Sequence, residues 1–289
     1  MNNSSVNFTS PESSTNSTTQ FIGLGESLEI CMHCINFLVG LPTHSYIAWL
    51  IITGTGSGVA SEFFILNLSV CEIVNCLNSL SCILVKFIWF SYLTILTEFL
   101  IGLVVTGRPL FQCLICVERY LAVVHPVTFL KFKTLRKRVI CCTVVWIITL
   151  GSCFYCMCPK VSDYISEVFF SLQFLLFLSI QLFCLVAVLR ALKQTGPGER
   201  GRERGEENPM KRRAFRLISI TIVSIIIIYA PFTISGFSLI LTQHYIQELF
   251  SFGLFCNVLA CFVQPVLYLN RVGKFSWLEV LLNRINMIH

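Results

Sequence analysis

The chain has 289 residues, of which 55% are hydrophobic and only 12% are charged. A soluble domain carries about 25% charged residues, so water is not the main solvent of this protein. The net charge of +6 comes from Lys and Arg residues that gather beside apolar segments. That distribution excludes a surface built for nucleic acid and makes the charge an indicator of membrane topology.

The first 27 residues form a polar tail that contains no Lys or Arg and no apolar run of signal-peptide type. We therefore expect no cleaved leader, with the first apolar segment acting as the targeting signal. The tail carries four Asn-x-Ser/Thr acceptors, which predict lumenal glycosylation at Asn2, Asn3, Asn7 and Asn16. The alternative is an ordinary disordered polar tail.

Seven apolar runs are long enough to cross a bilayer, because a spanning helix needs about 20 apolar residues. We predict an all-α fold, a seven-transmembrane helix bundle over residues 28–270. The expected spans are 28–53, 62–87, 93–124, 138–159, 164–193, 213–243 and 246–270. The Gly-rich stretch 53–58, the polar stretch 125–138 and the charged stretch 194–210 are expected to be loops. Residues 271–289 mix apolar and charged side chains, which predicts a short amphipathic helix on the inner membrane surface.

The distribution of basic residues predicts the orientation of the bundle. They concentrate at 131–138, 190–216 and 271–284, three segments that lie on the same side of a seven-span chain. The opposite side has only Lys86 and Lys160 near its membrane ends. Because cytoplasmic loops carry the excess of Lys and Arg, we predict an extracellular N-terminus and residence in the plasma membrane.

The most specific string of the sequence is Glu118-Arg119-Tyr120, followed by Pro126, at the inner end of the third span. It resembles the acidic-Arg-Tyr motif of the rhodopsin-like (class A) G-protein-coupled receptors. The resemblance implies that Arg119 is held by its acidic neighbour at rest and meets a heterotrimeric G protein when the sixth helix swings outward. A charge pair near the membrane edge suits such a switch, because nearby water lowers the cost of breaking it. The alternative is an interfacial Arg anchor.

Other positions extend the resemblance over residues 28–285. Trp146 resembles the family's fourth-helix tryptophan, and Pro231 resembles its sixth-helix kink, with Tyr229 where the family has tryptophan. Pro265 and Tyr268 resemble the seventh-helix Asn-Pro-x-x-Tyr motif, in which Gln264 replaces the asparagine. In the second span, Asn67-Leu68 precedes Glu72, which stands in the place of the family's aspartate.

Arg108 is the main departure from the family pattern. It lies eleven residues before Arg119, about three helical turns, so it is on nearly the same face but deep in the membrane. The family has a small polar residue there, which helps the second-helix aspartate to bind sodium. We predict an intramembrane ion pair between Glu72 and Arg108, in which the guanidinium takes the place of sodium. The alternative is an Arg108 that faces a wet cavity without a fixed partner.

The outer half of the third span bears on the ligand. Amine receptors of the family carry an aspartate at the position of Ile101, so the resemblance argues against a monoamine. The family also has a cysteine at the outer end of this helix, but residues 90–97 contain none. Most of the fifteen cysteines lie in apolar runs, where they are expected to be small buried hydrophobes, and the sequence assigns no disulfide.

The sequence shows no nucleophile–base pair, phosphate loop or metal-ligand spacing, so we expect neither an enzyme nor a cofactor or metal site. The expected partners are a heterotrimeric G protein, an extracellular ligand and membrane lipids. Two alternatives remain open at this level. One is a receptor-like seven-helix protein that does not couple to G protein, and the other is a transporter or channel that uses the Glu72–Arg108 pair as a charge relay.

Overall fold

A computed structural model describes residues 26–54, 62–87, 91–157, 163–193, 209–242 and 247–272. All regular structure in these segments is helical. Residues 26–35 are helical and continue into η1 (Asn36–Gly40) and α2 (Leu41–Ile52). The elements that follow are α3 (Phe63–Phe87), α4 (Ser91–Gly102), η2 (Leu103–Gly107), α5 (Arg108–Val124), α6 (Pro126–Phe132), α7 (Leu135–Cys156), α8 (Asp163–Lys193), α9 (Pro209–Thr242) and α10 (Gln247–Val272).

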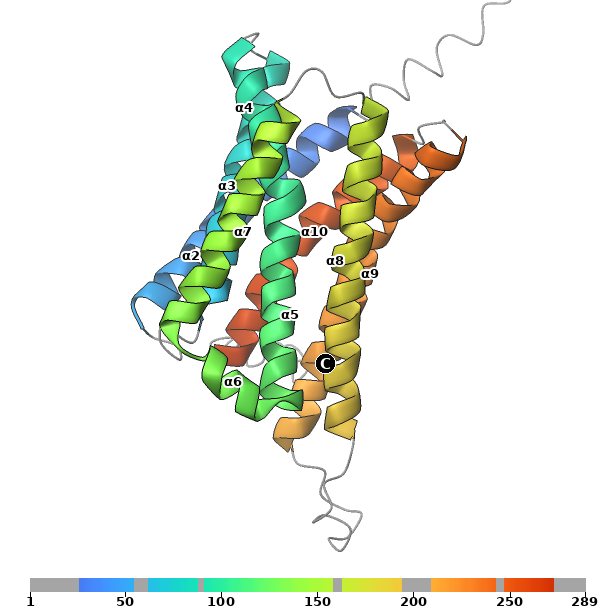
Figure 1. Cartoon of the computed structure of the whole chain (residues 1–289). Helices are drawn as coiled ribbons and strands as arrows, with labels where there is room; N and C mark the ends of the chain where they lie inside the picture. Colours follow the sequence, from blue (N-terminus) through green and yellow to red (C-terminus); the bar gives the residue numbers. More distant parts are fainter. Residues whose placement is uncertain are drawn as a thin grey trace, which may run out of the picture.

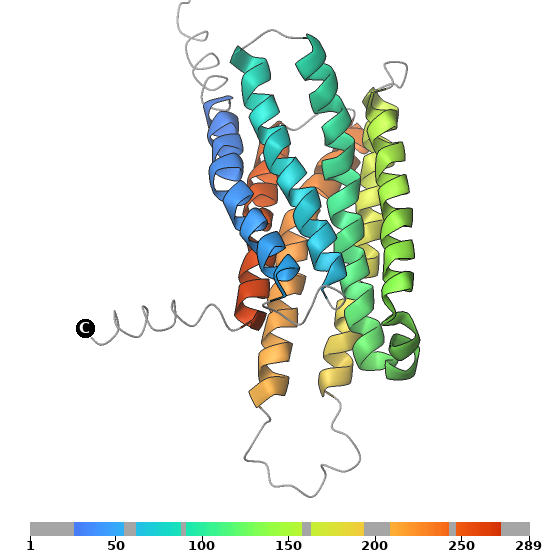
Figure 2. The ribbon, with the colours of Figure 1, turned by 90° about the vertical axis from the view of Figure 1, so that its left-hand side faces the viewer.

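Six helices of the described part are long and apolar enough to cross a membrane, counting α4, η2 and α5 as one. With α10 as a further long helix, they confirm the predicted seven-transmembrane bundle. Figures 1 and 2 show the long helices side by side, and in Figure 1 α5 lies between α7 and α8. α8 packs on α9, α9 packs on α10, and α10 returns to η1 and α2, so the first and last spans are neighbours.

Two spans contain a π-helical turn that ends two residues before a proline. η1 is followed by Pro42 and η2 is followed by Pro109. Proline has no N–H to donate and its ring crowds the preceding turn, so a widened turn relieves the clash while the helix continues. In the third span this wide turn immediately precedes Arg108 and therefore sets the rotation of its side chain about the helix axis.

The backbones of α4 and α7 approach each other closely, directly before η2. A Cβ on Gly102 would lie 2.5 Å from the Cα of Cys153 in α7, so only glycine allows this contact between α4 and α7. Membrane helices associate through such close packing, because lipid removes the hydrophobic driving force between them. Beside this contact, one core cluster surrounds Phe111 between α3, α5 and α7, and another surrounds Leu185 between α5, α8 and α9.

The predicted loop 125–138 is wrong in two respects. Residues Pro126–Phe132 form the short helix α6, which proline favours because it occupies a first-turn position where no N–H is needed. α7 begins at Leu135, so Arg138 belongs to a spanning helix and is buried. The sequence predicts a loop position for Arg138 because a basic residue at the inner end of a span usually lies outside the apolar core.

Several predicted features lie outside the described residues. These are the tail with Asn2, Asn3, Asn7 and Asn16, the amphipathic segment beyond residue 272, Lys160, and most of the charged stretch 194–210.

Candidate functional site

The centre of the bundle contains a charged pair that links the second and third spans. Arg108 of α5 donates through Nε to Oε1 of Glu72 in α3 at 2.5 Å, and its Nη2 donates to Oε2 of the same carboxylate. The side chains are 3% and 2% exposed. The structure therefore brings the two charges together in a bidentate, buried arrangement, the geometry in which guanidinium and carboxylate match best.

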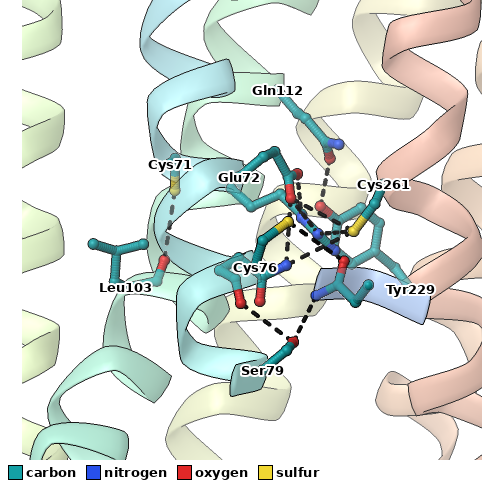
Figure 3. Close-up of polar contacts among 11 residues, drawn as sticks. Cys71, Glu72, Cys76, Ser79, Leu103, Gln112, Tyr229 and Cys261 are labelled. Carbon is teal, nitrogen blue, oxygen red and sulfur yellow. Dashed lines mark hydrogen bonds and ion pairs between the residues drawn. The ribbon is translucent and has the colours of Figure 1, made fainter. Parts of the chain in front are cut away.

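Other polar groups surround this pair, and Figure 3 shows them converging from several helices. Nη2 of Arg108 also lies 2.7 Å from Sγ of Cys261 in α10, and Asn75 Nδ2 donates to Glu72 Oε2 at 3.4 Å. Cys261 Sγ is 3.6 Å from the same carboxylate oxygen. The cluster thus joins α3, α5 and α10, and both oxygens of Glu72 accept hydrogen bonds from protein groups.

Towards the first span the network continues through neutral groups. Asn36 of η1 donates to Ser79 of α3 at 2.7 Å, and Ser79 donates to the carbonyl of Asn75 at 3.3 Å. His44 is 2% exposed in α2. Its Nε2 has no hydrogen-bond partner among the described residues.

One turn inward from Arg108, a hydrogen bond connects the third span to the sixth. Tyr229 of α9 donates through Oη to Gln112 Oε1 at 2.5 Å, and both residues are buried. Figure 3 shows this contact above the charged cluster. Pro231 follows two residues later in α9 and is also buried. The residue that replaces the family's sixth-helix tryptophan is therefore tied to the third span just where α9 loses a backbone hydrogen bond.

The acidic-Arg-Tyr motif lies at the inner end of α5. Glu118 accepts an ion-paired hydrogen bond from Nη2 of Arg138 in α7, and the Arg138 guanidinium also lies over the ring of Phe64, 5.6 Å from its centroid. Arg119, the next residue of α5, is half-buried. The expected hold of Glu118 on Arg119 stays a prediction, and the structure places the Arg138 guanidinium on the Glu118 carboxylate.

The remaining motif tyrosines have separate partners. Tyr120 Oη lies 3.0 Å from Nε2 of His125, the residue that joins α5 to α6. Tyr268 of α10 donates to Oε2 of Glu62, directly before α3, at 2.6 Å, and both side chains are buried. Tyr268 thus fastens the inner end of the seventh span to the second. Pro265, one turn earlier, is buried within α10.

At the outer half of the third span, Glu98 is exposed and Ile101 is 41% exposed. Lys86 at the outer end of α3 pairs with Glu29 at 2.8 Å. No disulfide joins the cysteines of the described segments, Cys153 and Cys156 included. The described residues contain no group of three or more His, Cys, Asp or Glu side chains that could hold a metal ion.

The geometry adds functional candidates that the sequence did not single out. Arg138, Glu62 and Cys261 each contact a predicted site residue, and Gln112 joins Tyr229 to the third span. A helical count can place two residues on one face of one helix, but it does not show which residue of another helix lies opposite. Of these four residues, only Glu62 could have been noticed in the sequence, because it is an acidic residue at the start of an apolar run.

Comparison with known families matches residues 45–268 to the 7 transmembrane receptor (rhodopsin family). The chain therefore belongs to the rhodopsin family of seven-transmembrane receptors and is a G-protein-coupled receptor. Among curated proteins it is similar to chemokine XC receptor 1 of Homo sapiens, with 27% identity over 276 residues that cover 84% of this chain and 78% of the relative. Chemokine XC receptor 1 of Mus musculus is 28% identical over 274 residues, 85% and 80% of the two chains. G-protein coupled receptor 35 of Homo sapiens is 26% identical over 144 residues, 45% of each.

Proposed function

We propose that this receptor recognises a chemokine-type peptide or protein at its outer face and passes the signal through Arg119 to a heterotrimeric G protein. The observation that carries the coupling is Glu118-Arg119-Tyr120 at the inner end of α5, in a chain that matches the receptor family across its helical part. The proposed orientation, with the N-terminus outside, is supported by the clustering of basic residues on one side and by the four glycosylation acceptors.

A peptide ligand has two lines of support. Ile101 is partly exposed in the outer half of the third span, at the position where amine receptors of the family carry their anchoring aspartate. The relatives that match most of the chain are receptors named for a chemokine. An apolar side chain offers no charge to a small ammonium ligand, whereas a peptide can spread its contacts over many residues.

The Glu72–Arg108 pair takes the place of a sodium ion in the resting receptor. Both carboxylate oxygens already accept hydrogen bonds from the guanidinium, so a cation would have to displace Arg108 first. The same contact argues that the pair is structural, because a charge relay needs an open path on at least one side.

The test is basal G-protein activation in cells that express the wild type or Arg119→Ala at matched surface levels, measured across all G-protein classes. Loss of the signal in the variant alone supports coupling through Arg119. Equal signals in both proteins would contradict it. Labelled chemokines are then tested for binding, with unlabelled monoamines as competitors, and binding that a monoamine displaces would overturn the peptide assignment.

Sodium independence is measured in the same membranes. Replacing sodium chloride with choline chloride at constant ionic strength leaves basal activity and chemokine affinity unchanged if Arg108 occupies the sodium position. A shift in affinity that the double variant Glu72→Gln, Arg108→Met abolishes would show that the cation acts at this carboxylate after all.

A further inference from the structure

A cavity of about 580 Å³ lies between the third, fourth and fifth spans, apart from the polar cluster. Its walls come from α7 and α8, and its floor includes Thr106 of η2. Leu176 is 57% exposed, Leu172 53% and Ile148 49%, so the cavity opens to the outside of the bundle. These helices are candidate membrane spans, and the opening therefore faces the hydrocarbon of the bilayer.

The floor of this cavity is polar, which is unusual for a surface that faces lipid. Gln173 donates through Nε2 to Thr106 Oγ1 at 2.8 Å, and Thr106 donates to Ser152 Oγ at 2.7 Å. Thr106 and Ser152 are 2% and 6% exposed. The chain of bonds leaves two groups unused among the described contacts, the Gln173 carbonyl oxygen as acceptor and the Ser152 hydroxyl hydrogen as donor.

The polar groups lie between an aromatic part of the lining, which is nearer the helix ends, and an aliphatic part, which lies deeper in the bundle. Ser152 is four residues before the end of α7 at Cys156, about 6 Å along the helix axis. Ile148, one turn further from that end, lines the deeper part. Near the surface the rings of Tyr155 and Phe169 lie 5.2 Å apart and form an aromatic wall.

We propose that this cavity binds a sterol of the surrounding leaflet, with its single hydroxyl on Ser152 and Gln173 and its ring system against Ile148 and Leu176. A hydroxyl uses the free donor and the free acceptor at once. The lining residues include no charged side chain, so a phosphate or carboxylate headgroup has no partner here. Broad aliphatic and aromatic walls in a cavity of this size match a flat, rigid apolar body.

The structure provides a substitution that fills the cavity without disturbing the fold. Gly151 lines the cavity, and a Cβ at this position meets no atom within 4 Å. Gly151→Phe therefore occupies the space that the sterol needs. Ile147→Phe is the matched control, because Ile147 is 64% exposed on the same helix and is not part of the lining.

The experiment is photolabelling of the full receptor in cell membranes with a diazirine sterol, at matched surface levels, followed by mapping of the labelled peptides. We expect labelling of residues 146–157 and 168–178 that cholesterol competes away. Gly151→Phe should reduce this labelling about tenfold, while Ile147→Phe should leave it unchanged. Equal labelling of wild type and Gly151→Phe, or labelling confined to other helices, would overturn the proposal.

A second comparison tests the hydroxyl. The wild type should prefer the sterol probe over its analogue without the hydroxyl by about threefold to tenfold, the range of one or two net hydrogen bonds. The double variant Ser152→Ala, Gln173→Leu should lose this preference while it still binds the analogue. A wild-type receptor that binds the sterol probe and its analogue equally would show that the polar floor does not recognise the hydroxyl. Labelling of these peptides by a diazirine fatty alcohol, with no competition from cholesterol, would assign the cavity to an acyl chain and overturn the sterol.

Discussion

Two ion pairs of the same chemistry lie at different depths of the bundle. Glu72–Arg108 is at the centre, where both side chains are at most 3% exposed and the guanidinium binds both carboxylate oxygens. Glu118–Arg138 is at the inner end, where Glu118 is 21% exposed. Charges at the centre have no water to replace a lost partner, whereas water reaches the inner pair.

This difference separates a structural role from a switching role. The central pair joins helices that remain together, and breaking it leaves an uncompensated charge in a medium of low dielectric constant. The inner pair lies beside Arg119, and its carboxylate can exchange one cation for another at modest cost. We therefore propose that the fixed charges lie in the core and the exchangeable charges lie beside Arg119, the residue proposed to meet the G protein.

The largest effect is expected from breaking the central pair. Glu72→Gln leaves a guanidinium that cannot lose its charge, and Arg108→Met leaves a carboxylate that can become neutral by taking up a proton. We expect each single variant to lose about 3–5 kcal/mol, enough to remove most folded receptor, with Glu72→Gln the more severe. Surface labelling and the thermal midpoint of purified receptor measure the loss.

The double variant Glu72→Gln, Arg108→Met is the control for this prediction. With both charges removed it should be more stable than either single variant, because no buried charge then lacks a partner. A double variant that is no more stable than Glu72→Gln would show that the two charges contribute independently. The central pair would then not have the structural role that separates it from the inner pair.

The next effect concerns the backbone that positions the central pair. Gly102→Ala places a methyl group against the Cys153 backbone, directly before the wide turn that leads into Arg108. We expect a loss of about 1–3 kcal/mol from this overpacking, read as a lower thermal midpoint. Gly151→Ala is the matched control, because it adds the same methyl group to a helix where nothing is within 4 Å. Equal midpoints for the two variants would contradict the close contact between α4 and α7.

Sequence reasoning identified the family, and the resemblance to that family brought Glu72 and Arg108 together, because the family keeps these two positions side by side. Hydropathy and helical periodicity supplied the helix ranges and the depth of Arg108. Sequence reasoning missed Arg138, because positive charge at the end of an apolar run usually indicates a loop. It also missed Gln112 and Cys261, since neutral side chains in apolar helices give no signal until the helices are packed. The two π-helical turns add a further reason, because each changes the helical register that a count assumes.

A moderate effect is expected at the inner pair, where signalling changes more than stability. Arg138→Ala leaves the Glu118 carboxylate to Arg119 and should lower basal G-protein activation about threefold. Glu118→Gln releases both arginines and should raise it by a similar factor. Arg136→Ala, at an exposed position of the same helix, is the control and should change nothing. A switching role for the inner pair requires basal activation to fall in Arg138→Ala and to rise in Glu118→Gln. Basal activity that falls in both would make Glu118–Arg138 a structural pair like the central one.

The smallest effect is expected from Tyr268→Phe, which removes only the hydroxyl that donates to Glu62. One hydrogen bond contributes about 0.5–1.5 kcal/mol, so the thermal midpoint should fall slightly. Because this bond fastens the seventh span to the second in the resting bundle, we expect basal activation to rise by about threefold or less. Tyr46→Phe is the matched control, because this tyrosine of α2 is 45% exposed and belongs to none of the motifs described above. A fall in basal activation for Tyr268→Phe would show that the Tyr268–Glu62 hydrogen bond stabilises the active state. Of these two contacts at the inner end, only Glu118–Arg138 would then belong to the resting state.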